Sequence, residues 1–133
     1  MTHPYDLQHL LDEGLVQGPL FIQTVFGLMG GIGAHYDDVM HMERTADRLF
    51  GDRYQWSVLG AGKNQLPISA SLGGYVRVRL EDSLRAGPGR PATSNAEQVV
   101  AVRQIIEGLG LEVATSDEAC ELLASKDAES VAF

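Results

Sequence analysis

The residues of this chain that are best suited to chemistry lie close together, in residues 75–83. Apolar residues alternate there with Arg77 and Arg79, and two adjacent carboxylates, Glu81 and Asp82, follow. The alternation predicts a strand whose successive side chains point to opposite faces, so Arg77, Arg79 and Glu81 share one face. Burying this much charge is unfavourable unless the charges are paired or bind a metal.

Two interpretations of this stretch are open. In the first, the strand ends at the two carboxylates, where the turning backbone lets both face one site. Glu81 is then a hard oxygen ligand for a metal, and Asp82 is a base held in place by Arg77. In the second, the stretch is an edge strand with solvated arginines and a carboxylate that caps the next helix.

The four histidines do not complete a metal site in the sequence. A catalytic zinc takes three protein ligands and keeps one position open. No two histidines have H-x-H or H-E-x-x-H spacing, and only His35 follows a glycine-rich loop. The single cysteine, Cys120, lies in a helical pattern with no histidine nearby, so we interpret it as a packing residue.

The elements that would position these residues repeat three times as strand, loop and helix, which is typical of an α/β fold with a parallel sheet. Right-handed crossovers place the three loops at the carboxyl end of that sheet, where ligands bind in barrels and in doubly wound sheets. We expect helices at residues 5–14, 36–50, 66–72, 94–109 and about 115–124, strands at 20–26, 55–59 and 75–80, an extended piece at 112–114, and loops at 27–33, 60–65 and 81–91. Ser94 and Glu97 have the spacing of a reciprocal helix cap, and Thr115 or Ser116 is expected to cap the last helix.

The glycine-rich loops suggest an anion site. Neither 27–33 nor 60–65 completes G-x-G-x-x-G or the P-loop pattern, so a nucleotide site does not follow. Glycines do let backbone N–H groups approach an anion, and a lysine can reach a phosphate or a carboxylate. We therefore expect Gly60, Gly62 and Lys63 to contact a cofactor.

Composition bounds the class of protein. The chain of 133 residues, 44% of them hydrophobic and 21% charged, is one domain or part of a larger one. Its net charge of −8 argues against nucleic acid or an anionic membrane as a partner. Without a long apolar run or a signal peptide, and with one cysteine, it is predicted to be cytoplasmic.

Several motifs occur in an order that closely resembles the β-keto acid cleavage enzyme family, from about Tyr5 onward. They are GPLFIQ at 18–23, GGIG at 30–33, QWSVLGAG at 55–62, VRVRLED at 76–82, GPG at 87–89, SNAE at 94–97 and EVAT at 112–115.

The resemblance implies a TIM barrel that binds zinc and exchanges the acyl group of a β-keto acid with acetyl-CoA, as in the 3-keto-5-aminohexanoate cleavage of lysine degradation. It implies that Glu81 binds zinc, that Asp82 is catalytic and that Arg77 orients Asp82. Residues 1–133 then form one partial barrel domain, similar to the last three of eight β/α units plus C-terminal helices.

The chain departs from the family pattern in four ways. The zinc-binding H-x-H pair of an early strand and a catalytic glutamate before Tyr5 are missing, Arg79 stands where glycine is usual, and the helix after Lys63 is about one turn short. We therefore expect the isolated chain to be inactive, and to require a missing N-terminal half or further copies of itself in a homo-oligomer.

Two other functions are compatible with the same sequence. The chain could be a non-catalytic assembly module that retains the oligomer contacts of the family, in which case Val102 and Ile106 on the apolar face of the helix at 94–109 matter and Glu81 does not. A weaker alternative is a small self-contained α/β protein that binds an acyl-CoA through its glycine-rich loops without zinc.

Overall fold

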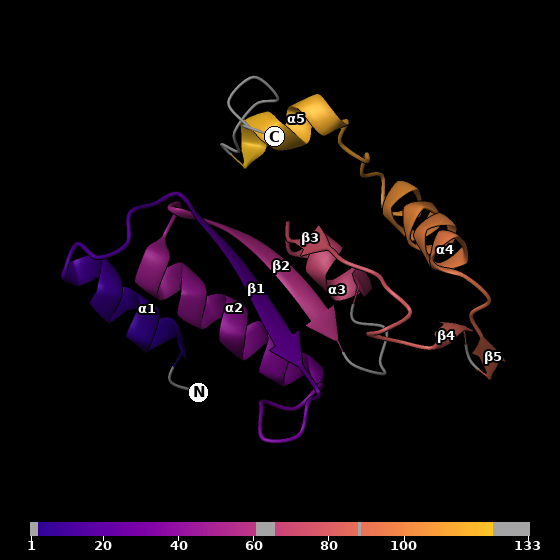
Figure 1. Ribbon diagram of the computed structural model, residues 1–133, viewed down its shortest axis with the longest axis horizontal. Coiled ribbons are helices and arrows are strands. Elements are labelled where there is room, and N and C mark those ends of the chain that lie inside the picture. Colours follow the sequence, from indigo (N-terminus) through magenta and orange to yellow (C-terminus); the bar gives the residue numbers. More distant parts are fainter. Residues whose placement is uncertain (1–2, 61–65, 88, 124–133) are drawn as a thin grey trace, which may run out of the picture.

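The computed structural model describes residues 3–60, 66–87 and 89–123. A three-stranded parallel sheet in the order β1-β2-β3 occupies the first part of the chain, and a small hairpin and two helices follow (Figure 1). The elements are α1 (His3–Asp12), β1 (Leu20–Phe26), α2 (Tyr36–Phe50), β2 (Tyr54–Gly60), α3 (Leu66–Ser71), β3 (Tyr75–Val76), β4 (Arg85–Gly87), β5 (Arg90–Pro91), α4 (Asn95–Gly108) and α5 (Ser116–Leu122).

The helices α1, α2 and α3 all contribute to the packing on one face of the sheet. Alternate residues of β1 and β2, such as Phe26 and Val58, pack against Val39 of α2 and Ile68 of α3. A second cluster joins the start of β1 to the end of α2, and Leu7 and Leu11 of α1 pack on it. The buried residues of the first cluster are Phe26, Val39, Trp56 and Val58. Those of the second cluster are Leu20, Ala46 and Phe50.

The opposite face of the sheet is open over much of β1. Phe21 is 53% exposed, and its ring lies 6.1 Å from that of Tyr75, on the same face of β3. Gln23 and Val25 follow at the alternate positions of the strand. The sheet therefore has one packed face and one face that the described residues leave partly uncovered.

The predicted α/β pattern is confirmed, and β1 and α2 have the predicted bounds. The start of α2 is fixed by His35, whose Nδ1 accepts a hydrogen bond from the backbone N–H of Asp37, while Asp38 Oδ2 accepts one from the backbone N–H of His35. This reciprocal capping satisfies backbone donors that the first turn of a helix leaves free. His35 is thus a helix cap.

The prediction of a strand at residues 75–80 is wrong beyond Val76. β3 pairs with β2 only at Tyr75 and Val76, opposite Ser57 and Val58, and pairing stops although Leu59 and Gly60 of β2 follow. Arg79 and Leu80 lie beyond the end of β2 in this register. The chain turns instead: the backbone N–H groups of residues 82 and 83 donate to the carbonyl of Arg79. An alternating pattern cannot extend a strand past the end of its neighbour.

The part of the chain after β3 differs more from the predictions. The predicted loop at 81–91 contains the antiparallel hairpin of β4 and β5. Residues 112–114, predicted as an extended piece, lie in no helix or strand. Ser94 caps α4 as predicted, and Thr115 caps α5. Cys120 is exposed on α5, so its interpretation as a packing residue is wrong. Nowhere in the described ranges is a helix both long enough and apolar enough to span a membrane.

We predict that Gly74→Ala destabilises the chain. A Cβ at residue 74 would lie 2.7 Å from Ser69 Oγ and 2.9 Å from Trp56 Cε3, and both side chains are buried. Relieving such overlap in a packed core costs about 1–3 kcal/mol. Urea denaturation should show this loss.

The matched control is Gly108→Ala, where nothing lies within 4 Å of the added Cβ. Alanine at this helix position should leave stability unchanged or raise it by less than about 1 kcal/mol. Equal midpoints for the two variants would contradict the packing described around Gly74.

Candidate functional site

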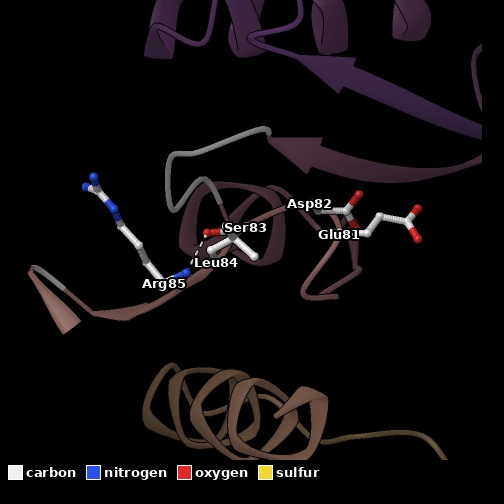
Figure 2. A pocket seen from close by; sticks show the side chains of 5 residues that line it. All are labelled: Glu81, Asp82, Ser83, Leu84 and Arg85. Atoms are coloured by element: carbon white, nitrogen blue, oxygen red, sulfur yellow. Dashed lines mark hydrogen bonds between the residues drawn. The ribbon is translucent and has the colours of Figure 1, made fainter. Parts of the chain in front are cut away.

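The turn after β3 lines a pocket of about 340 Å³ with five consecutive residues, from Glu81 to Arg85. Figure 2 shows the carboxylates of Glu81 and Asp82 reaching to one side of this turn, while the guanidinium of Arg85 extends in the opposite direction. The turn itself is closed by a hydrogen bond from the backbone N–H of Arg85 to Ser83 Oγ, 3.4 Å long. The two carboxylates therefore face one side of the site, and the guanidinium of Arg85 faces the other.

Arg77 lies at the centre of the contacts around the two carboxylates. Its Nη2 donates to Glu81 Oε1 across 3.2 Å, and its Nε lies 3.4 Å from Asp82 Oδ2. The second contact is an ion pair and not a hydrogen bond, because Asp82 Oδ2 is buried without a hydrogen-bond partner in the described part of the chain. The structure thus brings together Arg77, Glu81 and Asp82, as the first interpretation of this stretch expects.

The two carboxylates have different environments. The side chain of Glu81 is 59% exposed, and its Oε2 lies 2.8 Å from Nη2 of Arg79, so that both of its oxygens face a guanidinium. The side chain of Asp82 is only 13% exposed. A shielded carboxylate oxygen without a hydrogen-bond donor is able to accept a proton from a bound molecule.

Two residues of α4 hold the carboxylate-bearing turn from outside, and sequence analysis missed both. Asn95 Oδ1 accepts a hydrogen bond of 2.8 Å from the backbone N–H of Leu80. The buried Gln98 donates from Nε2 to the backbone carbonyl of Ser83. The only hint in the sequence is that polar residues open the first turn of this helix, and that pattern does not reveal which turn they contact.

A third residue missed in the sequence is Gln23 of β1. Its Oε1 accepts a hydrogen bond of 3.0 Å from Nη1 of Arg77, and its Nε2 donates to Ser57 Oγ of β2 across 3.3 Å. A signal was available, because a long polar side chain interrupts an otherwise apolar strand. Gln23 connects Arg77 to the two long strands of the sheet.

The described residues do not by themselves fit a zinc ion. Zinc takes three or four protein ligands, and among residues 3–60, 66–87 and 89–123 no three His, Cys, Asp or Glu side chains come together. Glu81 is at most one ligand, and His35 is engaged in capping α2. The ion pair of Arg79 with Glu81 further competes with a metal for the same carboxylate.

The predicted cofactor contacts are only partly within the structure. Gly60 is the last residue of β2 and pairs with Phe26 of β1, at the carboxyl end of the sheet. Gly62 and Lys63 lie outside the described residues. The expectation that the three residues contact a cofactor therefore stays a prediction.

The hairpin is joined to α4 by Glu97. Its Oε2 accepts hydrogen bonds from the backbone N–H of Thr93, at 2.7 Å, and from Thr93 Oγ1, at 2.8 Å, and its Oε1 pairs with Arg90. These donors favour the charged carboxylate, so they hold the pKa of Glu97 below its ordinary value. The expected reciprocal cap is therefore half formed: Ser94 accepts from the backbone N–H of Glu97, but the carboxylate binds elsewhere.

Comparison with known proteins places this geometry in context. A family model described as beta-keto acid cleavage enzyme matches residues 1–124. A 3,5-dioxohexanoate:acetyl-CoA acetone transferase of Paraburkholderia graminis is 53% identical over all of this chain and 44% of its own length. A 3-keto-5-aminohexanoate cleavage enzyme of Acetoanaerobium sticklandii is 34% identical over 86% of this chain and 41% of its own length. A 3-oxoadipate:acetyl-CoA acetyltransferase of Cupriavidus necator is 34% identical over 83% of this chain and 39% of its own length.

The chain spans less than half the length of these curated relatives, 44% in the first case. The site around Asp82 is thus compared with proteins that contain more than twice as many residues.

We predict that the link between the hairpin and α4 is lost in acid. Because the pKa of Glu97 is lowered from 4.5 in the folded chain, its contribution to stability is complete above pH 4.5 and disappears as pH falls through the lowered folded value. A carbon-detected NMR titration of the Glu97 carboxyl should give a midpoint below 4.5.

Glu97→Gln is the control, since its amide has no acid titration. In that variant the backbone N–H of Thr93 should show no acid transition. A midpoint for Glu97 at or above 4.5 would contradict the hydrogen bonds described here.

Proposed function

The chain belongs to the beta-keto acid cleavage enzyme family, and from that premise we propose that it contributes Arg77, Glu81 and Asp82 to the zinc-dependent cleavage of a β-keto acid with acetyl-CoA. The observation that carries the proposal is the position of Asp82 beside the guanidinium of Arg77, shielded and with one oxygen to which no described residue donates a hydrogen bond.

The proposed reaction exchanges two acyl groups. The acyl group of the β-keto acid leaves its carboxymethyl carbon and forms a thioester with the sulfur of CoA, and the acetyl group of acetyl-CoA bonds to that carbon, giving acetoacetate. The names of the relatives specify 3,5-dioxohexanoate, 3-keto-5-aminohexanoate and 3-oxoadipate, which all carry a keto group at carbon 3. We propose a substrate of this class.

In this reaction Asp82 accepts the proton that leaves the carbon between the keto and carboxylate groups of the substrate. Arg77 directs the carboxylate of Asp82 through the ion pair between its Nε and Asp82 Oδ2. The pair thereby prepares the substrate carbon for bond formation with the acetyl group.

Zinc enters the proposal as an ion that Glu81 helps to hold. When bound, zinc polarises the keto and carboxylate oxygens of the substrate as a Lewis acid. Because the described residues supply too few ligands, we propose that the others come from residues beyond this chain. Binding at Glu81 would displace its ion pair with Arg79.

The fold supports a partial barrel. In a singly wound barrel the strands follow one another in order and the helices stay on the outer face, whereas a doubly wound sheet has helices on both faces. Here β1, β2 and β3 are in order, and the core contacts of α1, α2 and α3 are with one face. We propose that further strands, from a missing N-terminal half or from another copy, cover the exposed face at Phe21 and the free edge of β1.

The partners and location are proposed on the same basis. Acetyl-CoA is the co-substrate, with Gly60, Gly62 and Lys63 as its contacts at the end of β2, and the assembly operates in the cytoplasm. We also propose that the working form contains more than one chain, since a sheet with an exposed apolar face and two edges is prone to associate.

A second candidate function is a non-catalytic assembly module, favoured by the exposure of apolar side chains. Phe21 on the sheet and Val99 and Val100 on α4 are each more than half exposed. Val102, expected from the sequence to contribute to the same helix face, is buried within the chain, so its substitution would disturb folding and not association.

We predict that catalysis appears on complementation. The chain is coexpressed with the part of the Paraburkholderia graminis relative that it does not match, and acetoacetate is measured from 3,5-dioxohexanoate and acetyl-CoA. Asp82→Asn should lower turnover by about 10²- to 10⁴-fold, since it removes a proton acceptor. Asp52→Asn, at an exposed turn after α2, is the control and should retain activity.

A complex that forms but makes no acetoacetate from any of the three acids would contradict the catalytic proposal. Phe21→Asp tests complex formation separately, because a charge on the exposed sheet face should prevent association. An inactive but stable complex that Phe21→Asp disrupts would favour the assembly module.

We predict that the complex binds zinc through Glu81. Glu81→Gln should weaken zinc affinity by more than about 100-fold, the upper range for loss of an outer-shell partner of a metal ligand. Competition with a chromophoric chelator measures the affinity without reference to turnover. Glu107→Gln, whose carboxylate pairs with Arg103 on α4, is the matched control. Equal affinity in the two variants would rule out Glu81 as a ligand.

A further inference from the structure

A row of polar side chains crosses the exposed face of the sheet. Gln23 of β1 and Ser57 of β2 are paired in the register of the two strands, and Ser57 is paired in turn with Tyr75 of β3. Arg77 lies just beyond the end of β3, and its hydrogen bond to Gln23 places it on the same side of the sheet. The row ends at the guanidinium of Arg77, which contacts the carboxylate-bearing turn.

Each of the three nitrogen atoms of this guanidinium has a different partner. Nη1 donates to Gln23, Nη2 donates to Glu81, and Nε pairs with Asp82. A planar guanidinium is fixed in direction only when more than one of its nitrogen atoms has a bonding partner. Gln23 is the one neutral partner in this set, and at 3.0 Å its contact is also the shortest.

Gln23 differs from the carboxylates in how far away it lies along the chain. Glu81 and Asp82 are four and five residues from Arg77, so they move together with the same segment. Gln23 is 54 residues away and belongs to a strand that pairs with β2 along its whole length. Because β3 ends at Val76, the bond from Arg77 to Gln23 ties the segment after β3 to the rigid part of the sheet.

The amide of Gln23 has a fixed orientation. Its oxygen faces the cation of Arg77 and its NH₂ group faces the hydroxyl of Ser57. Rotating the amide by half a turn would place its NH₂ group against the guanidinium, so that two donors would face each other. Asparagine is one methylene shorter and cannot reach both Arg77 and Ser57 from the same backbone position.

We propose that Gln23 is a positioning residue for the reaction, and this rests on the proposed function. It directs Nε of Arg77 toward Asp82 by holding Nη1 on the far side of the guanidinium. Without Gln23, an exposed ion pair with Glu81 and a 3.4 Å contact with Asp82 remain. Exposed ion pairs of this kind order side chains weakly, and Arg77 then turns toward Glu81 and away from Asp82.

The test compares Gln23→Met, Gln23→Glu and Gln23→Asn with the unmodified chain. Methionine keeps the length of the side chain and removes both hydrogen bonds, whereas glutamate keeps the acceptor for Arg77. Gln55→Met is the matched control. It is the same substitution at a residue of β2 that lies on the same face of the sheet as Gln23. The Arg77 guanidinium is observed by nitrogen-15 NMR, with Arg77→Lys to assign its signals.

In the unmodified chain and in the Gln23→Glu and Gln55→Met variants, the Nη1 and Nη2 groups of Arg77 should give separate signals, because rotation about the Nε–Cζ bond is restricted. In Gln23→Met and Gln23→Asn the signals should merge. Should the methionine variant fail to fold, the polar asparagine variant carries the same test. Separate Nη signals in either folded variant would overturn the proposal.

Kinetics of the complemented enzyme give a second readout. Gln23→Met should lower kcat by about tenfold to a hundredfold, the range for a misplaced catalytic group, and leave KM within about twofold, while Gln23→Glu restores most of kcat. A fall in kcat that glutamate does not restore would overturn the positioning role. If the unmodified complex makes no acetoacetate, the proposed function fails, while the NMR comparison of Arg77 still decides whether Gln23 holds the guanidinium.

Discussion

The contact between Arg77 and Gln23 is the interaction on which the candidate site depends. The strand that precedes Arg77 is only two residues long, so its pairing cannot define the path of the next six residues. The hydrogen bond that Arg77 donates to Gln23 of the sheet on one side, and the hydrogen bonds of Leu80 and Ser83 with Asn95 and Gln98 of α4 on the other, define that path instead. The two carboxylates lie between these hydrogen bonds. Their position therefore depends on long-range hydrogen bonds more than on strand geometry.

A second constraint is the division of the sheet into a packed and an open face. The helices bury the face that contains Phe26 and Val58, and this is where the stability of the chain resides. The opposite face contains Gln23, which contacts Arg77, and Ser57, which contacts Gln23. Chemistry on this side needs a cover that excludes water, so the proposed reaction and the proposed association have the same structural origin.

The sequence predicted the first part of the fold well. The apolar run of β1 and the capped, amphipathic α2 have strong local signals, and both elements begin and end at the expected residues. The strand predicted at residues 75–80 was mostly wrong, because the chain leaves β2 after Val76 and forms a turn closed at the carbonyl of Arg79, which alternation along the sequence does not show. The contact of Arg77 with Glu81 was predictable from their spacing, and Asp82 joined them only in the interpretation in which the backbone turns at the two carboxylates. Gln23, Asn95 and Gln98 act over 15 to 54 residues of chain, and no local pattern shows such contacts.

The most direct measurement of the central claim is exchange of hydrogen for deuterium at carbon 2 of 3,5-dioxohexanoate in D₂O, followed by proton NMR without acetyl-CoA. This isolates proton removal by Asp82 from the later acyl exchange. The account predicts that the complemented enzyme accelerates the exchange over the spontaneous rate, and that Asp82→Asn returns it to that rate. Equal acceleration by the unmodified complex and by Asp82→Asn would contradict the assignment of Asp82 as the base.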